Sequence, residues 1–266
     1  MESNIHFSVI MPTFNQCAFI RRAIGSLMEQ TYEKWELIII NDGCTDETDI
    51  FISDYIKDKR VTYIINKENT GLGHALNQGI AAARYNYISY LPSDDFYFPN
   101  HLESMAERFG RENVALVYSG LQNDTNDTMN RNTYNQSKQI FNGFCMQLVQ
   151  TAHRKYEVLQ WTERNEFITE DLYLMYWHKL ADKGFFVPTN TVSCFWTSHP
   201  HQRHTLISEK YGGGLNKYRN YYKPNIPLKI KVSRNKFIDE ESLYKDYHAM
   251  SPKCEKSLKI LIVGEL

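Results

Sequence analysis

Apolar runs alternate with helical patterns over the first hundred residues of the chain. Residues 6–11, 35–40 and 61–65 are β-branched or aromatic runs typical of buried parallel strands, and residues 87–91 form a fourth. Between these runs, apolar residues recur at helical spacing, at Ile20, Ala23, Ile24 and Leu27 and again at Ala75, Leu76, Gly79, Ile80 and Ala83. The pattern predicts an α/β fold whose central, mostly parallel sheet is flanked by helices.

A polar cluster follows each predicted strand. The clusters are residues 12–15, 41–43, 69–71 and 93–95. Each strand–helix unit is about thirty residues long, as expected of a crossover unit. In open parallel sheets, ligands bind outside the carboxyl ends of the strands. Four clusters on one rim therefore predict one site, in a nucleotide-binding half-domain.

The second half of the chain is less regular. Residues 114–118 predict another strand, and the Asn- and Thr-rich residues 122–137 predict a loop. A helix is expected from Thr169, a suitable N-cap, to near Gly184. The polar, His-containing residues 198–214 end in three glycines, which favours a hinge or a loop.

The last fifty residues suggest an extension. They are Lys-rich beyond Pro224, and a helix is expected over residues 239–250. Residues 258–264 resemble a buried strand. Two interpretations stay open: the first strand of a further α/β domain that is cut short, or an edge strand added to the preceding domain.

Composition narrows the class of protein. The 266 residues carry a net charge of −1 and are 42% hydrophobic, which favours a globular protein and argues against nucleic acid as a partner. The five cysteines are scattered and never in C-x-x-C spacing, so we expect no disulfide framework or zinc site, and a reducing cytoplasm. With no signal peptide and no apolar run near 20 residues, membrane association is expected to be peripheral at most.

Four motifs in order carry a family resemblance. They are Ser-Val-Ile-Met-Pro-Thr-Phe-Asn (8–15), Ile-Ile-Ile-Asn-Asp-Gly-Cys-Thr-Asp (38–46), Asn-Thr-Gly-Leu-Gly-His-Ala-Leu-Asn-Gln-Gly (69–79) and Ser-Asp-Asp (93–95). Together they resemble a family 2 glycosyltransferase with the GT-A fold. The resemblance is dense over residues 7–105, thinner to about 205 and absent beyond about 215. It implies a GT-A domain over 1–215, with a nucleotide-sugar half at 1–105 and an acceptor half at 106–215. The pattern of residues 216–266 separately predicts a helical C-terminal extension.

The resemblance assigns a nucleotide pocket. It implies that Pro12, Thr13, Phe14 and Asn15 line the base pocket and that Asp42 accepts a hydrogen bond from the base, usually uracil. By themselves, residues 12–15 suit an ordinary Pro turn, and residues 41–45 equally suit a turn and a helix N-cap. The same pocket is implied to include Asn69, Gly71 and Asn77. Leu76 stands where the family often has Arg, which removes one phosphate contact.

A metal site is implied at the fourth cluster. There Asp94 and Asp95 hold Mn²⁺ or Mg²⁺ against the diphosphate, since such cations favour carboxylate and phosphate oxygens. Asp94 is also assigned to the nucleotide site. The family's further Asp is replaced by Pro92, and the alternative is two acids in a turn.

A histidine is expected to join this metal site. We favour His199 over His201 and His204 as the ligand of metal or diphosphate. A separate metal site within residues 199–204 is the alternative.

The acceptor side carries the implied catalytic base. The resemblance assigns Asp171 as the base that deprotonates the acceptor hydroxyl, with Glu170 beside it, although acids also suit the first turn of a helix. Trp161 and Trp177 flank this pair in sequence and are candidates for stacking on an acceptor sugar.

The implied activity is inverting, metal-dependent transfer of a sugar from a nucleotide sugar, expected to be a UDP-sugar, to a saccharide or lipid-linked saccharide. Its expected setting is bacterial polysaccharide or glycan assembly, in the cytoplasm or at the inner face of the membrane. Two alternatives remain. A sugar-1-phosphate nucleotidyltransferase would need a Gly-rich basic loop where residues 12–16 stand. A non-catalytic module that binds sugar nucleotide would explain Pro92 and Leu76.

Overall fold

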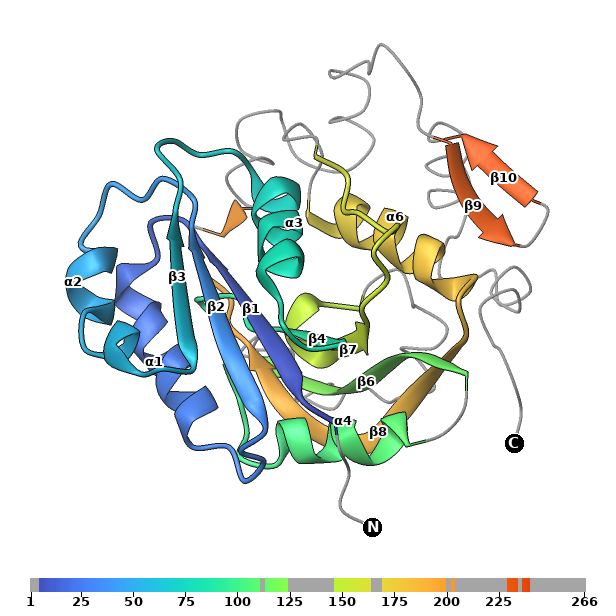
Figure 1. Cartoon of the computed structure of the whole chain (residues 1–266), viewed down its shortest axis with the longest axis horizontal. Helices are drawn as coiled ribbons and strands as arrows, with labels where there is room; N and C mark the ends of the chain where they lie inside the picture. Colours follow the sequence, from blue (N-terminus) through green and yellow to red (C-terminus); the bar gives the residue numbers. More distant parts are fainter. Residues whose placement is uncertain are drawn as a thin grey trace.

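The computed structural model describes residues 5–110, 113–123, 146–163, 169–199, 202–203, 229–233 and 236–239. The first half contains β1 (Phe7–Thr13), α1 (Cys17–Met28), β2 (Trp35–Asn41), α2 (Thr48–Ile52), η1 (Tyr55–Lys57), β3 (Val61–Ile65), α3 (Leu72–Ala82), β4 (Tyr87–Tyr90), β5 (Phe96–Tyr97) and α4 (His101–Phe109). The second half contains β6 (Val114–Asn123), η3 (Leu148–Gln150), β7 (Thr151–Arg154), α6 (Thr169–Ala181), β8 (Phe185–Trp196), β9 (Lys229–Ser233) and β10 (Lys236–Asp239). Figure 1 shows these elements in sequence colours.

One curled sheet organises the molecule. Its strand order is β3-β2-β1-β4-β7-β6-β8-β5. Strands β3, β2, β1 and β4 are mutually parallel, as are β6 and β8, whereas β7 runs antiparallel between β4 and β6. The parallel half of the sheet thus contains the four strands that the alternating pattern predicts. The same sheet continues through β7, β6 and β8 into the second half of the chain.

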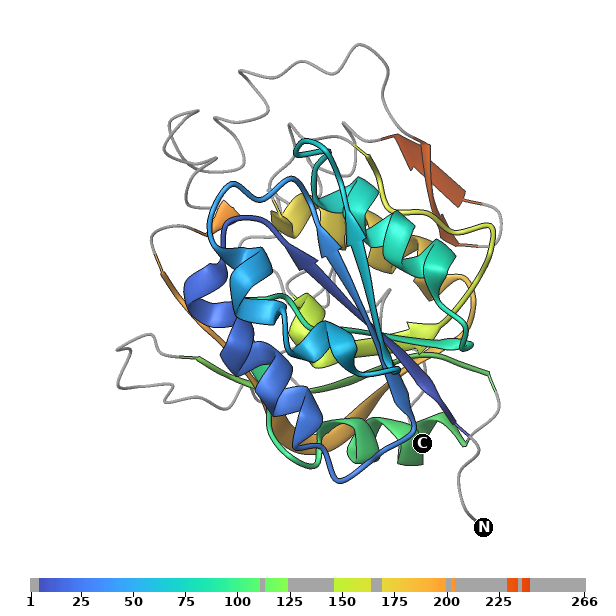
Figure 2. The same ribbon diagram turned by 60° about the vertical axis from the view of Figure 1, so that its left-hand side comes forward.

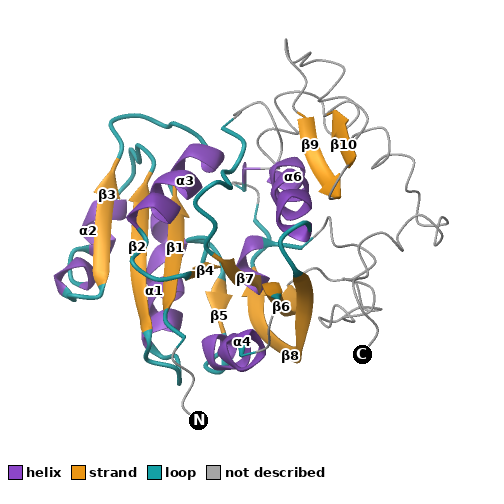
Figure 3. Cartoon of the chain, turned by 45° about the vertical axis from the view of Figure 1, so that its right-hand side comes forward, coloured by secondary structure: helices purple, strands orange, loops and turns teal. Residues whose placement is uncertain are grey.

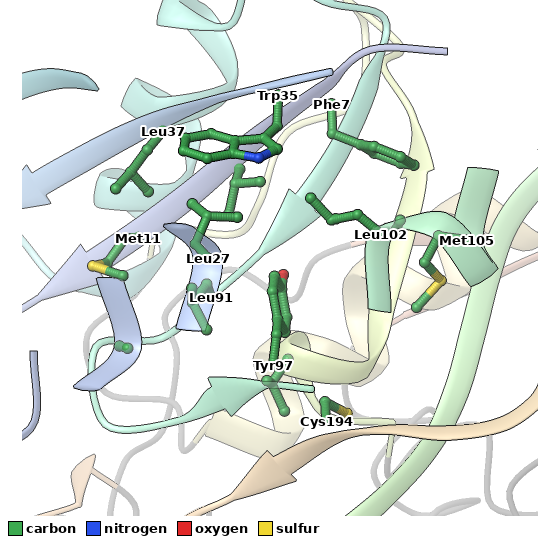
Figure 4. Close-up of a cluster of buried hydrophobic side chains, with 14 of the residues drawn as sticks. Phe7, Met11, Leu27, Trp35, Leu37, Leu91, Tyr97, Leu102, Met105 and Cys194 are labelled. Atoms are coloured by element: carbon green, nitrogen blue, oxygen red, sulfur yellow. The ribbon is translucent and has the colours of Figure 1, made fainter. Parts of the chain in front are cut away.

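Alternation along β1 and β2 divides the core between the two faces of this sheet. Val9 and Leu37 pack with α1 and α4, in the cluster of Figure 4, whereas Ile10 and Ile38 pack with α3 and α6 on the other face. Successive strand side chains point to opposite faces, so a strand covered by helices on both sides must be apolar throughout. Figure 2 shows α1 and α3 on either side of the strands.

Helix patterns agree with the expected faces. In α1 the buried residues are Ile20, Ala23, Ile24 and Leu27. In α3, Leu76 is fully buried, and its side chain packs in the core between this helix and the sheet. The interpretation that Leu76 removes a phosphate contact stays a prediction.

Two features of the second half differ from expectation. The described part of the extension is the antiparallel hairpin of β9 and β10, which lies beside α6 in Figure 3, rather than a helix. The helix expected over 239–250 and the strand over 258–264 lie outside the described residues, apart from Asp239, which ends β10. Of the loop expected over residues 122–137, the structure describes Gln122 and Asn123, which end β6. The rest of that loop lies outside the described residues. Within the described parts of the chain, no helix combines the length and apolar composition that a membrane span needs.

Candidate functional site

The carboxyl ends of β1, β2 and β4 meet at one rim. Strand β1 lies between β2 and β4, but its pairing with β4 ends at Ile10, three residues before β1 itself ends. Pro12 lies in this unpaired stretch, where a missing backbone N–H breaks no ladder bond with β4. Strands β1 and β4 are thus no longer paired where the polar clusters begin.

The first cluster presents an aromatic face and a buried hydroxyl. Phe14 is 42% exposed, whereas Thr13 is 2% exposed and its Oγ1 has no hydrogen-bond partner within the described structure. Asn15 adopts a left-handed conformation (φ 53°), and its Oδ1 accepts the Thr45 amide at 2.7 Å. The end of β1 is thereby joined to the turn after β2.

Asp42 organises the loop between β3 and α3. Its Oδ1 accepts hydrogen bonds from Asn66 Nδ2 at 2.9 Å and from the amide and hydroxyl of Thr70 at 2.9 and 2.5 Å. Its Oδ2 accepts the amide of Gly71 at 2.8 Å. Gly71 begins α3 with φ 95°, a conformation that favours glycine. The predicted base acceptor is thus also the anchor of the third cluster.

Asn41 forms the turn after β2. Its Oδ1 accepts the Cys44 amide at 2.7 Å, and its Nδ2 donates to Tyr63 Oη at 2.6 Å and Asp49 Oδ1 at 3.0 Å. The turn interpretation of residues 41–45 therefore holds for Asn41.

Two further residues of the predicted pocket lie apart from these contacts. Asn69 is exposed at the tip of the loop. Asn77 lies one and a half turns into α3, where its Oδ1 accepts the Trp161 amide at 2.8 Å and its Nδ2 donates to Glu163 Oε1 at 2.7 Å. Asn77 therefore joins α3 to residues 161–163, and the structure does not bring it to the other site residues.

Asp94 and His199, 105 residues apart in sequence, lie together. His199 Nε2 is 3.1 Å from Asp94 Oδ2, and the two side chains are 8% and 18% exposed. The His199 ring stacks on Phe19 at 4.5 Å between centroids. Its Nδ1 is buried without a hydrogen-bond partner within the described structure. The structure thus brings two of the predicted metal-site residues, Asp94 and His199, into direct contact.

Asp95 is directed elsewhere. It is 2% exposed, and its Oδ1 accepts the backbone amide of Thr197 at 2.9 Å. The two adjacent carboxylates thus differ: Asp94 faces His199, and Asp95 faces the chain that carries His199.

The Asp94–His199 pair suits a hard divalent cation. Neighbouring ligands of an octahedral cation with bonds of about 2.1 Å lie about 3.0 Å apart, close to the 3.1 Å observed. A carboxylate oxygen and an imidazole nitrogen are both ligands for Mn²⁺, and Mg²⁺ accepts the carboxylate. Among the residues that the structure describes, no cluster of three His, Cys, Asp or Glu forms a closed metal cage. Such a pair leaves positions for phosphate oxygens and water.

On the acceptor side, the structure places Glu170 and Asp171 in the first turn of α6, and their side chains lie outside the described part. Trp161 and Trp177 are 2% and 1% exposed within the core, so the expectation that they stack on a sugar is wrong. Trp161 instead stacks on Tyr176 at 4.0 Å. His201 and His204 lie outside the described residues.

Sequence reasoning missed three residues around His199. Arg22 donates from Nη2 to the Asp94 carbonyl and to Thr197 Oγ1, both at 2.7 Å. Gln202 donates from Nε2 to the Thr197 carbonyl at 2.5 Å. Thr197 and Gln202 carry no motif, and Arg22 lies on the polar side of an amphipathic helix, so only the tertiary contacts identify them.

Solved structures share this fold. TarS residues 1–349 of S. aureus, in complex with UDP-GlcNAc, align with a TM-score of 0.61 at 17% identity, covering 75% of this chain and 60% of that one. The mannosyltransferase PcManGT of Pyrobaculum calidifontis, in complex with GDP-Man and Mn²⁺, aligns with a TM-score of 0.63 at 17% identity, covering 81% and 63%. The α/β architecture is thus of the GT-A type expected.

Comparison of sequences identifies the family. An uncharacterized glycosyltransferase of Rickettsia prowazekii is 37% identical over 128 residues, which are 46% of this chain and 39% of that protein. The uncharacterized glycosyltransferase EpsJ of Bacillus subtilis is 33% identical over 127 residues, 48% of this chain and 36% of that one. The chain thus matches well under half the length of these curated relatives. The family model for glycosyl transferase family 2 matches residues 8–185, and the chain therefore belongs to that family.

Proposed function

We propose that the chain is a metal-dependent, inverting glycosyltransferase that moves a sugar from a UDP-sugar to a hydroxyl of a saccharide or lipid-linked saccharide. The observation that carries this proposal is the approach of Asp94 and His199 at the rim of the parallel strands. Family membership supports sugar transfer, and the UDP-GlcNAc bound to TarS and the GDP-Man and Mn²⁺ bound to PcManGT support a nucleotide-sugar donor and a metal. The proposed setting is bacterial polysaccharide or glycan assembly, in the cytoplasm or at the inner face of the membrane.

Donor binding is assigned to the rim. Phe14 supplies an exposed ring for stacking on the base, and the neighbouring Thr13 has a buried hydroxyl without a hydrogen-bond partner among the described residues. Asp42 Oδ2 accepts a hydrogen bond from the Gly71 amide, and a carboxylate oxygen has two lone pairs. A second lone pair of this oxygen can accept the base N–H without releasing the loop.

Asp94 and His199 are assigned as the metal ligands, with Mn²⁺ or Mg²⁺ as the cation. When bound, the cation neutralises charge on the diphosphate leaving group. Arg22 adds a permanent positive charge on the same side, since it contacts the Asp94 carbonyl.

Asp171 is assigned as the general base and Glu170 as the neighbouring acid that positions the acceptor. In this assignment the Asp171 carboxylate takes the proton of the acceptor hydroxyl. The hydroxyl oxygen forms a bond to the anomeric carbon on one face as the bond to the diphosphate oxygen breaks on the other. The products are the inverted glycoside and a nucleoside diphosphate.

Isothermal titration with UDP and GDP, each with and without Mn²⁺, tests donor and metal together. We expect Mn²⁺-dependent binding of UDP that weakens by at least about tenfold in Asp94→Ala, since even outer-shell metal partners are worth that much. The matched control is Asp54→Ala, which removes an exposed carboxylate paired with Lys57. Tighter binding of GDP than of UDP would mean that the donor is a GDP-sugar instead of a UDP-sugar. Absence of binding to either nucleotide would contradict the proposal.

A second measurement separates catalysis from binding alone. Asp171→Asn should keep donor affinity and lose about 10²–10⁴-fold in transfer, because base catalysis acts in the transition state. Release of sugar from the donor without acceptor would already argue against a non-catalytic binding module. A large loss of UDP affinity in Asp171→Asn would instead indicate a structural role in the first turn of α6.

A further inference from the structure

The chain that carries His199 is attached to the molecule at several points. Asp95 accepts the Thr197 amide, and Arg22 donates to the Thr197 hydroxyl. Gln202 holds the same segment from the other side: its Nε2 donates to the Thr197 carbonyl, and its Oε1 accepts the His199 amide at 3.3 Å. Thr197 and Gln202 are 6% and 5% exposed. We call Arg22, Asp95, Thr197 and Gln202 the His199 latch.

Arg22 is itself fixed by aromatic neighbours. Its guanidinium lies 4.8 Å above the ring of Phe96 and 5.7 Å from that of Phe19, the ring on which His199 stacks. A planar guanidinium stacks on rings while donating in its own plane, which Lys cannot do. Arg22 thus joins α1, the Asp94 turn and the segment after β8.

From this geometry we propose that the latch is a positioning device that sets His199 against Asp94, and that Asp95 is part of it rather than a ligand of the metal. The inference rests on the proposed function in so far as the Asp94–His199 pair holds the cation. It assigns the two adjacent acids different roles: Asp94 binds the cation, and Asp95 positions the backbone that carries His199. Partners that orient a metal ligand typically change metal affinity 10–100-fold when removed.

Paired substitutions at residue 95 separate the two roles. Asparagine keeps an oxygen that can accept the Thr197 amide but loses the charge, whereas alanine loses both. We expect Asp95→Asn to bind Mn²⁺ within about threefold of wild type and Asp95→Ala to bind it at least about tenfold more weakly, by electron paramagnetic resonance titration. Asp94→Asn removes a proposed metal ligand, so it should weaken Mn²⁺ binding whichever role Asp95 has. Equal losses in Asp95→Asn and Asp95→Ala would overturn the inference by making Asp95 a ligand.

A measurement without metal keeps the latch testable by itself. Because His199 stacks on Phe19, its ring protons should carry a ring-current shift, assigned by comparison with His199→Gln. In metal-free protein these resonances should move toward random-coil positions in Asp95→Ala and stay in place in Asp95→Asn. Thr197→Val, which removes only the Arg22 contact and leaves the backbone amide, guards against misfolding and should move them partway.

Mn²⁺ affinity and the His199 resonances together distinguish a failure of the metal assignment from a failure of the latch. If wild type binds no Mn²⁺ while the His199 resonances respond as expected, the latch stands and the metal assignment fails. If Asp95→Ala and Thr197→Val leave the His199 resonances unmoved, the latch is overturned, whatever the affinity for Mn²⁺.

Discussion

At the scale of single residues, Asp42 shows how one carboxylate serves two purposes. It is 4% exposed and accepts four hydrogen bonds from Asn66, Thr70 and Gly71. A buried carboxylate costs stability unless donors surround it, and these donors all come from the loop before α3. The carboxylate therefore fixes the loop before any ligand arrives.

Asp42→Asn should destabilise the protein by about 1–3 kcal/mol, because the amide directs an N–H at one of the four donors and leaves it unsatisfied. Urea denaturation gives the free energy of unfolding. Asn69→Ala, in the exposed tip of the same loop, is the control and should unfold like wild type. An unchanged midpoint in Asp42→Asn would mean that the loop does not depend on this carboxylate.

The sequence predicts those site residues that lie in a recognisable motif or polar segment. Asp42, Asp94 and His199 were within reach because they lie in ordered motifs or in a polar segment typical of a site. Arg22 and Gln202 were not, because hydrogen bonds to backbone carbonyls leave no pattern in a sequence. Trp161 and Trp177 misled for the opposite reason: proximity to Asp171 in sequence says nothing about burial, and both lie in the core.

At the scale of elements, two buried histidines lie on strand β7 and helix α4. Burial lowers the pKa of His153 to about 4 and that of His101 to about 3. Neutral His153 can donate from Nδ1 to the Arg154 carbonyl and accept the Tyr90 hydroxyl at Nε2, 2.7 Å away. At a pH between these values and the ordinary histidine pKa of about 6.5, both histidines are therefore neutral in the folded protein and protonated in the unfolded chain.

Acid should destabilise the fold in a defined window. Since the unfolded pKa is about 6.5, the unfolded state binds more protons below that value, and the free energy of unfolding falls as the pH falls toward about 4. Each histidine contributes at most about 1.4 kcal/mol per pH unit. Urea midpoints from pH 7 to pH 5 measure the slope, which should be shallower in His153→Gln. A slope unchanged by this substitution would contradict the assignment of a neutral buried His153.

Apolar periodicity predicts the parallel elements well and the second half poorly. Strand β3 has the expected bounds, and α1 buries the expected four residues. Strand β8 escapes prediction because Pro188 and Asn190, the latter with φ 65°, interrupt its apolar run. Strand β5 is only two residues long and pairs antiparallel with β8, so its existence depends on a partner about one hundred residues away.

At the scale of the whole molecule, the single sheet bears on how the chain unfolds. The predicted boundary at residue 105 falls inside α4, while β4 pairs with β7 and β5 with β8 across it. The core beneath α3 likewise mixes residues of both halves, such as Leu76 and Trp177. The two halves therefore share one core rather than possessing one each.

We expect one cooperative unfolding transition for residues 1–215. Far-ultraviolet circular dichroism and tryptophan fluorescence should give coincident urea midpoints, since Trp35 lies in one core cluster and Trp161 in the other. Two separated transitions would show that the halves fold as independent domains.

The close packing of α3 also limits which sequences can be exchanged between relatives. A side chain at Gly73 would place its Cβ 2.0 Å from the Thr162 carbonyl oxygen, and Asn77 bonds the neighbouring backbone at Trp161. A chimera joined at residue 105 would set the 161–163 segment of one parent against the α3 of the other. Such hybrids should fold only when the α3 parent supplies glycine and an amide at these positions, so a join at residue 105 suits only α3 parents that carry both residues.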